Sequence, residues 1–496
     1  MINAVRRISS FPVLLGSLLV GAVFTAGRAF YLDPDVWWHL RTGESILRTH
    51  QWPTADPYSF TVHGSPWMAY EWLGDVLLAG VQRAAGLRGL AGLDIALGAA
   101  VVVALYVLAT LRSRNSKAAF VACLLLLMLA EVSFTLRPQM LGYLFLVLTL
   151  IALERFRQGR PGALWFLPFL FVVWVNTHGS FVVGLTAIAA YWASGLVKFS
   201  VGGLEARRWS PAQRQRLALV FLLCLVALLL TPYGARLAVY PLDMAFAQPL
   251  NVANIREWQP MAFDLMVGKL FLALLLLFLV AQVTFRPSYR LGEIALLLLG
   301  AVMACLHARF VLVFVPFFAP LVAVLLARWV PEYAPAKDRY ALNAILVAVM
   351  VAGMIRFFPS RRALERTVAA AFPQQAVDYL RQHPVPLPMF NSYGFGGFLI
   401  WSLGPSQHVF IDGRADIYER EGVLSDYLNI ERLAPHALAT LRAYGVESCL
   451  VDRDEPLATL LAASPEWRQV YVDKVAALFV RTSGALRETV DQRTLQ

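Results

Sequence analysis

The chain of 496 residues is 58% hydrophobic and only 15% charged, with a mean hydropathy of +0.60. A soluble protein averages about 45–50% apolar and about 25% charged residues, so the composition excludes an ordinary soluble enzyme and indicates a polytopic membrane protein. The formal charge of +11 does not indicate a nucleic-acid partner, because the basic residues lie between apolar runs rather than on one face of a helix. The four cysteines are far apart and indicate neither a disulfide framework nor a CxxC metal site.

Apolar runs follow one another along the first 358 residues, and we count about eleven. A run of about 17 to 25 residues can cross a hydrocarbon core of about 30 Å as a helix, although several of these runs are shorter. The first follows Arg6 and Arg7 but has no small-residue cleavage site, so we expect an uncleaved first helix. The predicted cores are 11–30, 90–111, 118–134, 140–153, 163–176, 180–197, 217–231, 269–285, 291–306, 308–327 and 340–357.

Lysine and arginine gather in alternate loops. With a cytoplasmic N-terminus, the predicted cytoplasmic segments carry 18 of these residues in 61 positions, and they are 1–10, 112–117, 154–162, 198–216, 286–290 and 328–339. The opposite loops carry 8 in 109 positions, and they are 31–89, 134–139, 176–179, 232–268 and 307–309. This bias satisfies the positive-inside rule. Because eleven is odd, the tail from residue 359 is expected outside the cytoplasm.

The tail differs from the rest of the chain, since it holds 16 of the 32 acidic residues. We predict helices near 373–383 and 436–444, and short strands at PMFN, HVFID, VESCLV and WRQVYV. The fold class is therefore a polytopic α-helical membrane protein of about eleven spans with a small C-terminal soluble α/β domain. Its predicted parts are a membrane domain, 1–358, with long external loops at 31–89 and 232–268, and an extracytoplasmic domain, 359–496.

The first external loop is longer than a hairpin connection requires, and loops of this length often carry function. Asp33 and Asp35 flank a proline directly after the first span, and Trp37, Trp38 and His39 then begin a predicted helix. In one interpretation the tryptophans form an aromatic belt at the headgroups and one aspartate caps the helix. In the other, the two carboxylates lie beside a membrane-embedded cavity.

The other external loops each present an ionisable or polar side chain at the same membrane depth. These residues are Arg137, His178, Tyr233, Glu257, His307 and Arg309. Each has a structural explanation when taken singly, such as a snorkelling arginine, but together they indicate an active site at the external interface. A carboxylate can act as a base, and arginines can bind a phosphate in a bidentate manner. A lipid-linked phosphosugar presents its phosphate at this depth, where Asp33 or Asp35 would be the base and Arg309, with Arg137 or His307, would bind the phosphate.

The sequence also resembles a known family. DPDVWWHLRTGESIL, followed by ADPYSF and WMAYEWLGDVL, is similar to the first external loop of the GT-C class of membrane glycosyltransferases, in particular the oligosaccharyltransferase catalytic subunit of archaeal and eukaryotic type. The resemblance implies that Asp33 is the catalytic aspartate, with Asp35 as a neighbour that could substitute. NIREWQP and HARFVLVFVPFFAP resemble later segments of the family, and they imply an acceptor-side role for Glu257 and a donor-phosphate role for Arg309.

The tail segments NSYGFGGFLIWSL and HVFIDGRADIY loosely resemble the acceptor-motif region of that family, but the Trp-Trp-Asp triplet is absent. The second external loop lacks an Asp-x-Asp pair, so a metal-independent mechanism is the simpler expectation. If a divalent cation is bound, Asp33, Asp35 and Glu257 are its candidate ligands. Asp412 and Arg414 either contact the acceptor or simply pair with each other. The candidate acceptor-binding residues are His39, His178, Tyr233, Tyr393 and Trp401.

The predicted function is an inverting transfer of a sugar or glycan from a polyprenyl-phosphate-linked donor. Its expected partners are that donor and membrane lipids, with no nucleic acid, and the sequence assigns no acceptor. We expect a protein of a bacterial inner (plasma) membrane, with its active site and tail on the periplasmic side. Two alternatives are a transporter of lipid or polysaccharide, which would place charges at midspan and show internal repeats, and an assembly protein that displays the tail.

Overall fold

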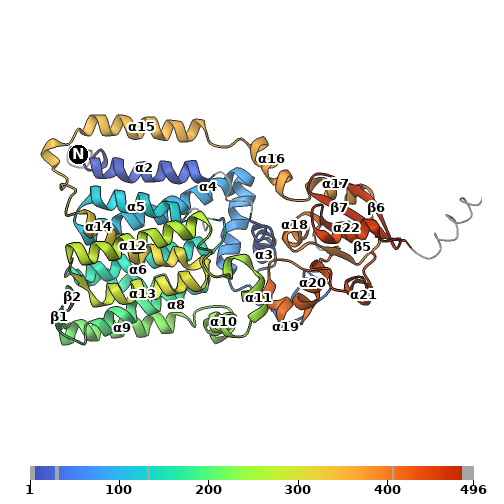
Figure 1. The fold of residues 1–496 in the computed structure, drawn as a ribbon, viewed down its shortest axis with the longest axis horizontal. Coiled ribbons are helices and arrows are strands. Elements are labelled where there is room, and N and C mark those ends of the chain that lie inside the picture. The colour runs from blue at the N-terminus through green and yellow to red at the C-terminus, as the bar shows by residue number, and fades with distance from the viewer. Residues whose placement is uncertain (1–5, 28–32, 131–134, 405–406, 483–496) are drawn as a thin grey trace, which may run out of the picture. The chain divides into compact units, whose positions relative to one another are not determined.

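A computed structural model describes residues 6–27, 33–130, 135–404 and 407–482 (Figure 1). The chain divides into two compact units. Unit 1 comprises Met1–Phe30, Ala91–Asp243 and Val252–Phe358, and unit 2 comprises Tyr31–Leu90, Met244–Asn251 and Pro359–Gln496. The first external loop and the C-terminal tail therefore belong to one folding unit, although they are more than 260 residues apart in sequence.

Unit 1 is a bundle of apolar helices, and each of the eleven predicted spans overlaps a helix, although residues 28–30 and 131–134 of two predicted spans lie outside the described residues. Several of these helices have 9 to 16 residues, fewer than a full crossing requires. The helices that overlap the predicted spans are α2 (Phe11–Ala26), α4 (Trp72–Ser113), α5 (Ser116–Ala130), α6 (Gln139–Arg157), α7 (Leu167–Val175), α8 (Phe181–Ser194), α9 (Pro211–Ala227), α12 (Met266–Phe285), α13 (Leu291–Leu306), α14 (Val311–Leu326) and α15 (Tyr340–Arg356). Helices α10 (Ala235–Phe246) and α11 (Pro249–Asn254) lie in the predicted loop 232–268.

Among the residues that the structure describes, four helical segments are long and apolar enough to cross a membrane by themselves. They are Trp72–Ser113, Gln139–Arg157, Met266–Phe285 and Ala308–Leu326, and Tyr340–Arg356 together with Arg361–Ala371 makes a fifth if the pair is one span. The protein is therefore a mostly helical membrane protein with several spans. The count of about eleven crossings stays a prediction.

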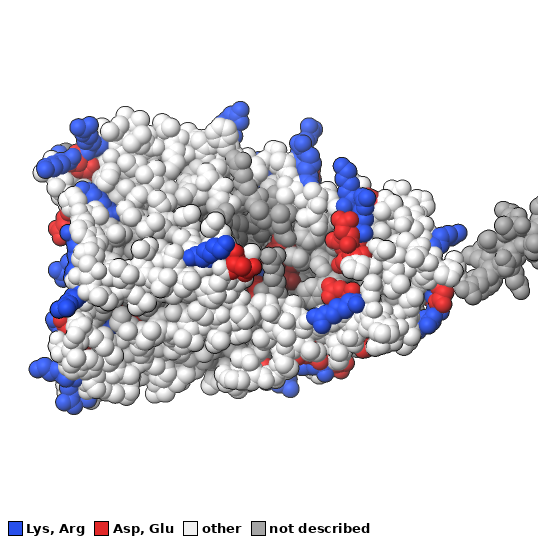
Figure 2. Space-filling view, viewed as in Figure 1, with Lys and Arg blue, Asp and Glu red and all other residues white. Residues whose placement is uncertain are grey.

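Burial separates the centre of the bundle from its surface. Nearly all of α14 is buried, including its two internal prolines, Pro316 and Pro320. On α12, by contrast, large apolar side chains are exposed, and Leu277 and Val283 are 65% and 79% exposed. A contiguous apolar surface of this kind is typical of a face in contact with lipid. Figure 2 shows this uncharged surface over the helices of unit 1.

The predicted cytoplasmic segments meet at one end of unit 1. There Asn343 donates to the carbonyl of Ser9 at 3.0 Å, and Arg328 donates to the carbonyl of Phe285 at 2.6 Å. Strands β1 (Phe199–Val201), β2 (Leu204–Ala206) and β3 (Tyr289–Arg290) form a small sheet at this end, in which β2 and β3 are parallel. Lysine and arginine gather where β1 and β2 lie (Figure 2). The alternation of basic loops in the sequence thus corresponds to one end of the bundle.

Unit 2 combines the first external loop with the tail around a mixed sheet of order β4-β5-β7-β6, in which only β4 and β5 are parallel. Its strands are β4 (Met389–Asn391), β5 (Ser448–Asp452), β6 (Trp467–Val472) and β7 (Ala476–Arg481). Its helices are α3 (Val36–Thr49), the first part of α4, α16 (Arg361–Ala371), α17 (Gln374–Gln382), α18 (Tyr393–Leu403), α19 (Ala415–Arg420), α20 (Val423–Glu431), α21 (Ala437–Ala443) and α22 (Pro456–Ala463).

The predicted strand at HVFID is wrong, because a side chain satisfies this backbone instead of a sheet ladder. Asn391 accepts a hydrogen bond from the N–H of Phe410 at 2.8 Å and donates one to the carbonyl of Ile411 at 2.8 Å. Val409 forms only an isolated bridge with Ser59 of the first loop. The segment therefore joins the tail to the first external loop.

The aromatic-belt interpretation is also wrong, because Trp37 and Trp38 are only 4% and 3% exposed. The Trp37 ring packs edge to face against Phe372 and Phe398, with centroids 5.4 and 5.1 Å away. Helix α18, which the sequence did not predict, lies close to this core because Gly397 faces the carbonyl of Pro34, where a Cβ atom would be too close. The two tryptophans belong to the apolar core of unit 2.

Candidate functional site

Three charged side chains from different predicted external segments meet in unit 1. Arg137 precedes α6, Glu257 lies in the 3-10 turn η4 (Arg256–Trp258), and Arg309 lies in the turn η5 (Ala308–Phe310). The Glu257 carboxylate is 3.2 Å from Nη1 of Arg137 and 3.1 Å from Nη1 of Arg309. The two guanidinium groups therefore share one carboxylate, and we call these three residues the diarginine cluster.

Local contacts hold the two turns that carry this cluster. The N–H of Ala308 donates to the carbonyl of Gln259 at 2.9 Å, and His307 Nδ1 lies 2.5 Å from the carbonyl oxygen of Trp258. The guanidinium of Arg309 lies over the Trp258 ring, 4.2 Å from its centroid, in a cation–π contact. His307, predicted to bind phosphate, thus holds the turn η4 beside the cluster.

The cluster carries a net positive charge. Burial alone would raise the pKa of Glu257, but the charges of Arg309 and Arg137 outweigh burial and hold that pKa below its ordinary value. Burial, with the charge of Arg309, lowers the pKa of His178 to about 3. Near neutral pH the carboxylate is ionised and the imidazole is neutral, so two arginines and one glutamate leave one positive charge. Guanidinium groups in such surroundings bind phosphate or carboxylate anions.

The remaining candidate residues of unit 1 are His178 and Tyr233. In addition to burial, Arg309 and Arg137 lie close enough to His178 to lower its pKa, and His178 accepts a hydrogen bond from the N–H of Ser180 at 3.1 Å through Nδ1. Tyr233 lies in the turn between α9 and α10, where its N–H donates to Thr231 at 3.5 Å. The sequence prediction that external-loop residues converge is therefore met by Arg137, Glu257, Arg309, His178 and, through Trp258, His307.

The predicted catalytic aspartates lie in unit 2, at the start of α3. Asp33 is buried, and its Oδ1 accepts a hydrogen bond from the N–H of Asp35 at 2.9 Å. Asp35 is the N-cap residue of α3 but makes no side-chain cap. Its Oδ1 lies against the backbone of Gly413, where a Cβ atom would collide with it. A glycine at this position lets the carboxylate approach the tail.

His39 is the most buried of the candidate acceptor residues, with 1% exposure. Its Nδ1 lies 2.6 Å from Asp75 and its Nε2 lies 3.5 Å from Glu71, so it joins α3 to the start of α4. Tyr393 and Trp401 lie on α18 and are half-buried. The Tyr393 hydroxyl donates to the carbonyl of Gly413 at 3.2 Å.

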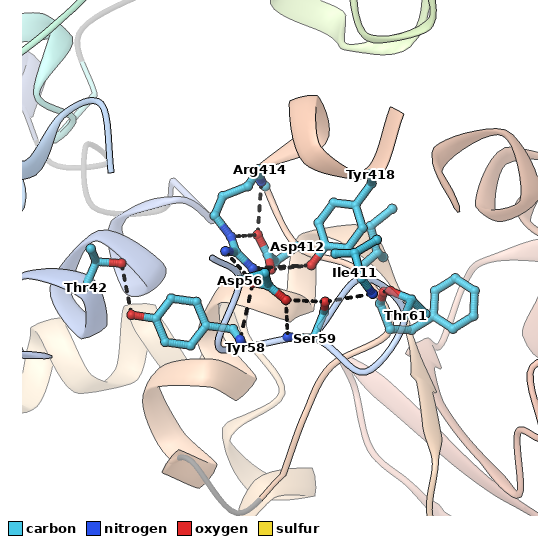
Figure 3. Close-up of polar contacts among 12 residues, drawn as sticks. Thr42, Asp56, Tyr58, Ser59, Thr61, Ile411, Asp412, Arg414 and Tyr418 are labelled. Atoms are coloured by element: carbon cyan, nitrogen blue, oxygen red, sulfur yellow. Dashed lines mark hydrogen bonds and ion pairs between the residues drawn. The ribbon is translucent and has the colours of Figure 1, made fainter. Parts of the chain in front are cut away.

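A buried ionic network in unit 2 was only partly visible in the sequence. Arg414 pairs with Asp412 at 2.6 Å, as one of the two sequence interpretations predicted, and also with Asp56 at 2.7 Å. All three side chains have 0% exposure, and Figure 3 shows the guanidinium between the two carboxylates. Tyr418 donates to Asp412 at 2.6 Å. We call Asp56, Asp412, Arg414 and Tyr418 the buried network.

The electrostatics of this network differ from those of the diarginine cluster. Burial alone would raise the pKa of Asp56, but Arg414 and hydrogen bonds from Ser59 outweigh it and lower that pKa. Burial would lower the pKa of Arg414, but Asp412 and Asp56 raise it well above its ordinary value. The aromatic rings of Tyr58 and Trp67 lie 4.9 and 4.7 Å from the guanidinium carbon. In the sequence, Asp56 stands out only as an acidic residue in a long loop rich in aromatic residues. That pattern did not identify Arg414 as its partner.

The candidate metal ligands that the sequence predicts are Asp33, Asp35 and Glu257. Within residues 6–27, 33–130, 135–404 and 407–482, no group of three or more His, Cys, Asp or Glu side chains could hold a metal ion. Glu257 belongs to unit 1, whereas the two aspartates belong to unit 2. Their metal-binding role stays a prediction.

Comparison with known proteins gives a likeness in fold but not in sequence. No family model matches the chain, and no curated protein matches it. The structure is similar to the oligosaccharyltransferase of Archaeoglobus fulgidus tethered to an acceptor peptide, with a TM-score of 0.53, 12% identity, and coverage of 94% of this chain and 74% of that one. It is also similar to ArnT of Cupriavidus metallidurans bound to undecaprenyl phosphate, with a TM-score of 0.53, 14% identity, and coverage of 95% and 98%.

ArnT in its apo state gives a similar result, with a TM-score of 0.54, 15% identity, and coverage of 95% of this chain and 97% of that one. At these identities the likeness concerns the fold. The fold-level resemblance that the first external loop indicated is therefore confirmed over nearly the whole chain.

Proposed function

We propose that this chain, which has the fold of the GT-C glycosyltransferases, is itself a membrane glycosyltransferase that uses a polyprenyl-phosphate-linked donor. The observation that carries the proposal is the diarginine cluster, in which Arg137 and Arg309 share Glu257. The fold supports it, since one structure with this fold is ArnT bound to undecaprenyl phosphate. The acceptor is a nucleophile on the extracytoplasmic face.

Arg309 and Arg137 bind the donor phosphate in this proposal. When the sugar leaves its donor, negative charge grows on the phosphate, and guanidinium groups already in place stabilise that charge in the transition state. Glu257 stays ionised because its pKa is low, and it keeps the two guanidinium groups turned toward each other. The contact with the Trp258 ring restricts the Arg309 side chain, so the arginine loses fewer rotamers when phosphate binds.

Asp33 or Asp35 acts as the general base. The carboxylate accepts the proton of the acceptor while the acceptor attacks the anomeric carbon and the phosphate departs from the opposite side, so the reaction inverts the configuration. Tyr393 and Trp401 are the acceptor-binding residues that we retain in unit 2, because both are half-buried. His39 instead fixes α3 to α4 through Asp75.

The topology of the proposal follows the positive-inside rule. Helix α6 runs from Gln139, beside the diarginine cluster, to Arg157 at the basic end of unit 1. Its 19 residues span about 28 Å at 1.5 Å per residue, close to the thickness of a hydrocarbon core. We therefore place the basic end in the cytoplasm and the cluster on the extracytoplasmic face of a bacterial inner membrane, with about eleven crossings.

The direct test is sugar transfer in proteoliposomes that contain the full-length protein and radiolabelled polyprenyl-phosphate-linked sugars extracted from membranes. We expect Arg309→Gln and one of Asp33→Asn and Asp35→Asn to lose transfer by at least about 100-fold, the usual effect of removing a group that stabilises or generates the transition state. The matched controls are Arg236→Gln and Asp264→Asn, which remove exposed charges from the same predicted loop as Glu257. The controls should retain transfer.

Unchanged transfer in Arg309→Gln and in both aspartate variants would overturn the proposed roles. The transporter alternative makes a different prediction, because a transporter moves the lipid-linked sugar across the vesicle without breaking the sugar–phosphate bond. Movement of label between leaflets with intact donor would support that alternative. An assembly protein would need the tail but tolerate all three variants.

A further inference from the structure

A second basic site lies in unit 1, in a cavity of about 490 Å³. Five arginines and one glutamate are among its lining residues, which gives these side chains a formal charge of +4. They are Arg114, Arg157, Arg160, Arg207, Arg290 and Glu205. A cavity of this size is in the range that binds small molecules. It is lined by five arginines, compared with two in the diarginine cluster.

The cavity is at the other end of the bundle from that cluster. Helix α6 begins next to the cluster and ends at Arg157 in the cavity wall, and α13 runs from Leu291 in the wall to Leu306 beside His307. The two sites are therefore separated by about the thickness of a hydrocarbon core. A donor phosphate bound at the cluster cannot account for the arginines of the cavity.

The arginines of the cavity differ in how their charge is compensated. Arg290 lies 2.7 Å from Glu154 and 3.3 Å from Glu293, so carboxylates compensate it. Arg157 instead lies over the rings of Tyr191 and Trp209, at 4.6 and 5.4 Å, and its buried Nε has no hydrogen-bond acceptor among the described residues. Arginines that line one cavity repel one another, and an anion bound there would reduce this repulsion and would also accept from Arg157.

The walls of the cavity are held without a ligand. Trp209 donates from its indole N–H to the carbonyl of Tyr191 at 3.0 Å, and its ring packs where a Cβ atom on Gly195 would collide with it. On β2, Glu205 accepts a hydrogen bond from the Ser288 hydroxyl at 2.7 Å, which fixes β2 beside β3. Binding an anion here would not require the backbone to be ordered first, which favours affinity.

Exposed apolar side chains lie close in sequence to a lining residue of the cavity. Trp192, Leu196 and Val197 are 36%, 38% and 43% exposed, and they lie within three residues of Ser194, which lines the cavity. A soluble phosphate ion has no apolar part that could contact such a surface, whereas a phospholipid carries acyl chains next to its phosphate. We propose that this cavity binds the headgroup phosphate of an anionic phospholipid from the leaflet at the basic end of unit 1, as basic pockets between transmembrane helices do.

The test is lipid binding by purified full-length protein after its native lipids have been removed. The probes are phosphatidylglycerol, phosphatidylcholine and inorganic phosphate, and native mass spectrometry counts the bound lipids. We expect phosphatidylglycerol to bind at least about tenfold more tightly than phosphatidylcholine. The variant Arg157→Gln/Arg160→Gln should lose that preference, and the control Lys198→Gln/Arg208→Gln should keep it, because the control removes two exposed charges nearby that do not line the cavity.

Equal binding of the two lipids, or equal loss in variant and control, would overturn the proposal. So would inorganic phosphate at millimolar concentration displacing phosphatidylglycerol completely, because the site would then be one for soluble phosphate. A thermal unfolding curve of the variant that overlays that of the native protein shows that lost binding is not lost folding. The result is independent of sugar transfer, since no residue of the diarginine cluster is changed.

Discussion

The diarginine cluster and the buried network both combine arginine with carboxylates, but in opposite proportions. In unit 1 two arginines share one glutamate, and the three side chains remain 17% to 32% exposed. In unit 2 two aspartates share one arginine, and all three side chains have no exposure. The first arrangement retains positive charge that a ligand can reach, and the second retains negative charge that no solvent reaches.

This difference separates binding from folding. A buried charge that loses its partner is costly because water cannot replace the partner, so changes to the buried network should appear as lost stability. A partly exposed cluster is screened in part by solvent, so changes to the diarginine cluster should appear as lost binding and transfer with little change in stability. Substitutions in the two sites test this separation.

The largest effect is expected for Arg414→Met. The substitution leaves Asp56 and Asp412 buried without their shared cation, which typically costs about 3–5 kcal/mol. The loss in the free energy of unfolding is measured by denaturant unfolding of the purified protein, with proteolysis of the tail as the readout. Arg468→Met is the control, because Arg468 is exposed on β6. Adding Asp56→Asn and Asp412→Asn to Arg414→Met should recover part of the stability, and no recovery would contradict the charge argument.

The next effect concerns Arg309 and is expected in transfer rather than stability. Arg309→Lys keeps the positive charge but loses the planar fork that binds phosphate at two oxygens and lies over Trp258. We expect transfer to fall by about 100-fold to 1,000-fold in Arg309→Gln and by less in Arg309→Lys. Thermal unfolding should change little in both variants. Equal activity of the two variants would contradict a role for the charge, because lysine keeps the positive charge that glutamine lacks and both variants lose the planar fork.

A smaller effect is expected from the acidic side chains at low pH. The folded pKa of Asp56 is below its ordinary value of 3.8, so its ionised form stabilises unit 2 above that pH and the stability is lost as the pH falls through the folded pKa. Asp56→Asn should lower stability at pH 7 by about 1–3 kcal/mol and weaken the loss below pH 4. Glu257→Gln, in the partly exposed cluster, should change stability by less than about 1 kcal/mol. Unfolding measured between pH 3 and 7 compares the two.

The helices of unit 1 could be predicted because lipid imposes a simple rule. Any segment surrounded by hydrocarbon must satisfy its own backbone hydrogen bonds, so an apolar run such as 291–306 can only become a helix, and α13 has those bounds. The convergence of Arg137, Glu257 and Arg309 could also be predicted, because alternate loops of a helical bundle return to the same end.

The arrangement of unit 2 could not be predicted, because it depends on contacts between distant segments. HVFID has the pattern of a strand, but Asn391 bonds its backbone. Trp37 and Trp38 have the composition of an aromatic belt, but Phe372 and Phe398 of the tail pack around Trp37. Nothing in a single sequence showed that the first external loop and the tail form one unit.

The smallest effect is expected for His178, and it concerns pH dependence alone. Its pKa is lowered to about 3 by burial and by Arg309, and it accepts the N–H of Ser180 through Nδ1, which requires that nitrogen to be unprotonated. His178 therefore keeps one neutral form between pH 5 and 8. Transfer by His178→Gln should show the same pH profile as native protein over this range, whatever its absolute rate. A profile that loses an inflection near pH 6 to 7 in the variant would mean that His178 is protonated there, and the cluster would then carry two positive charges rather than one.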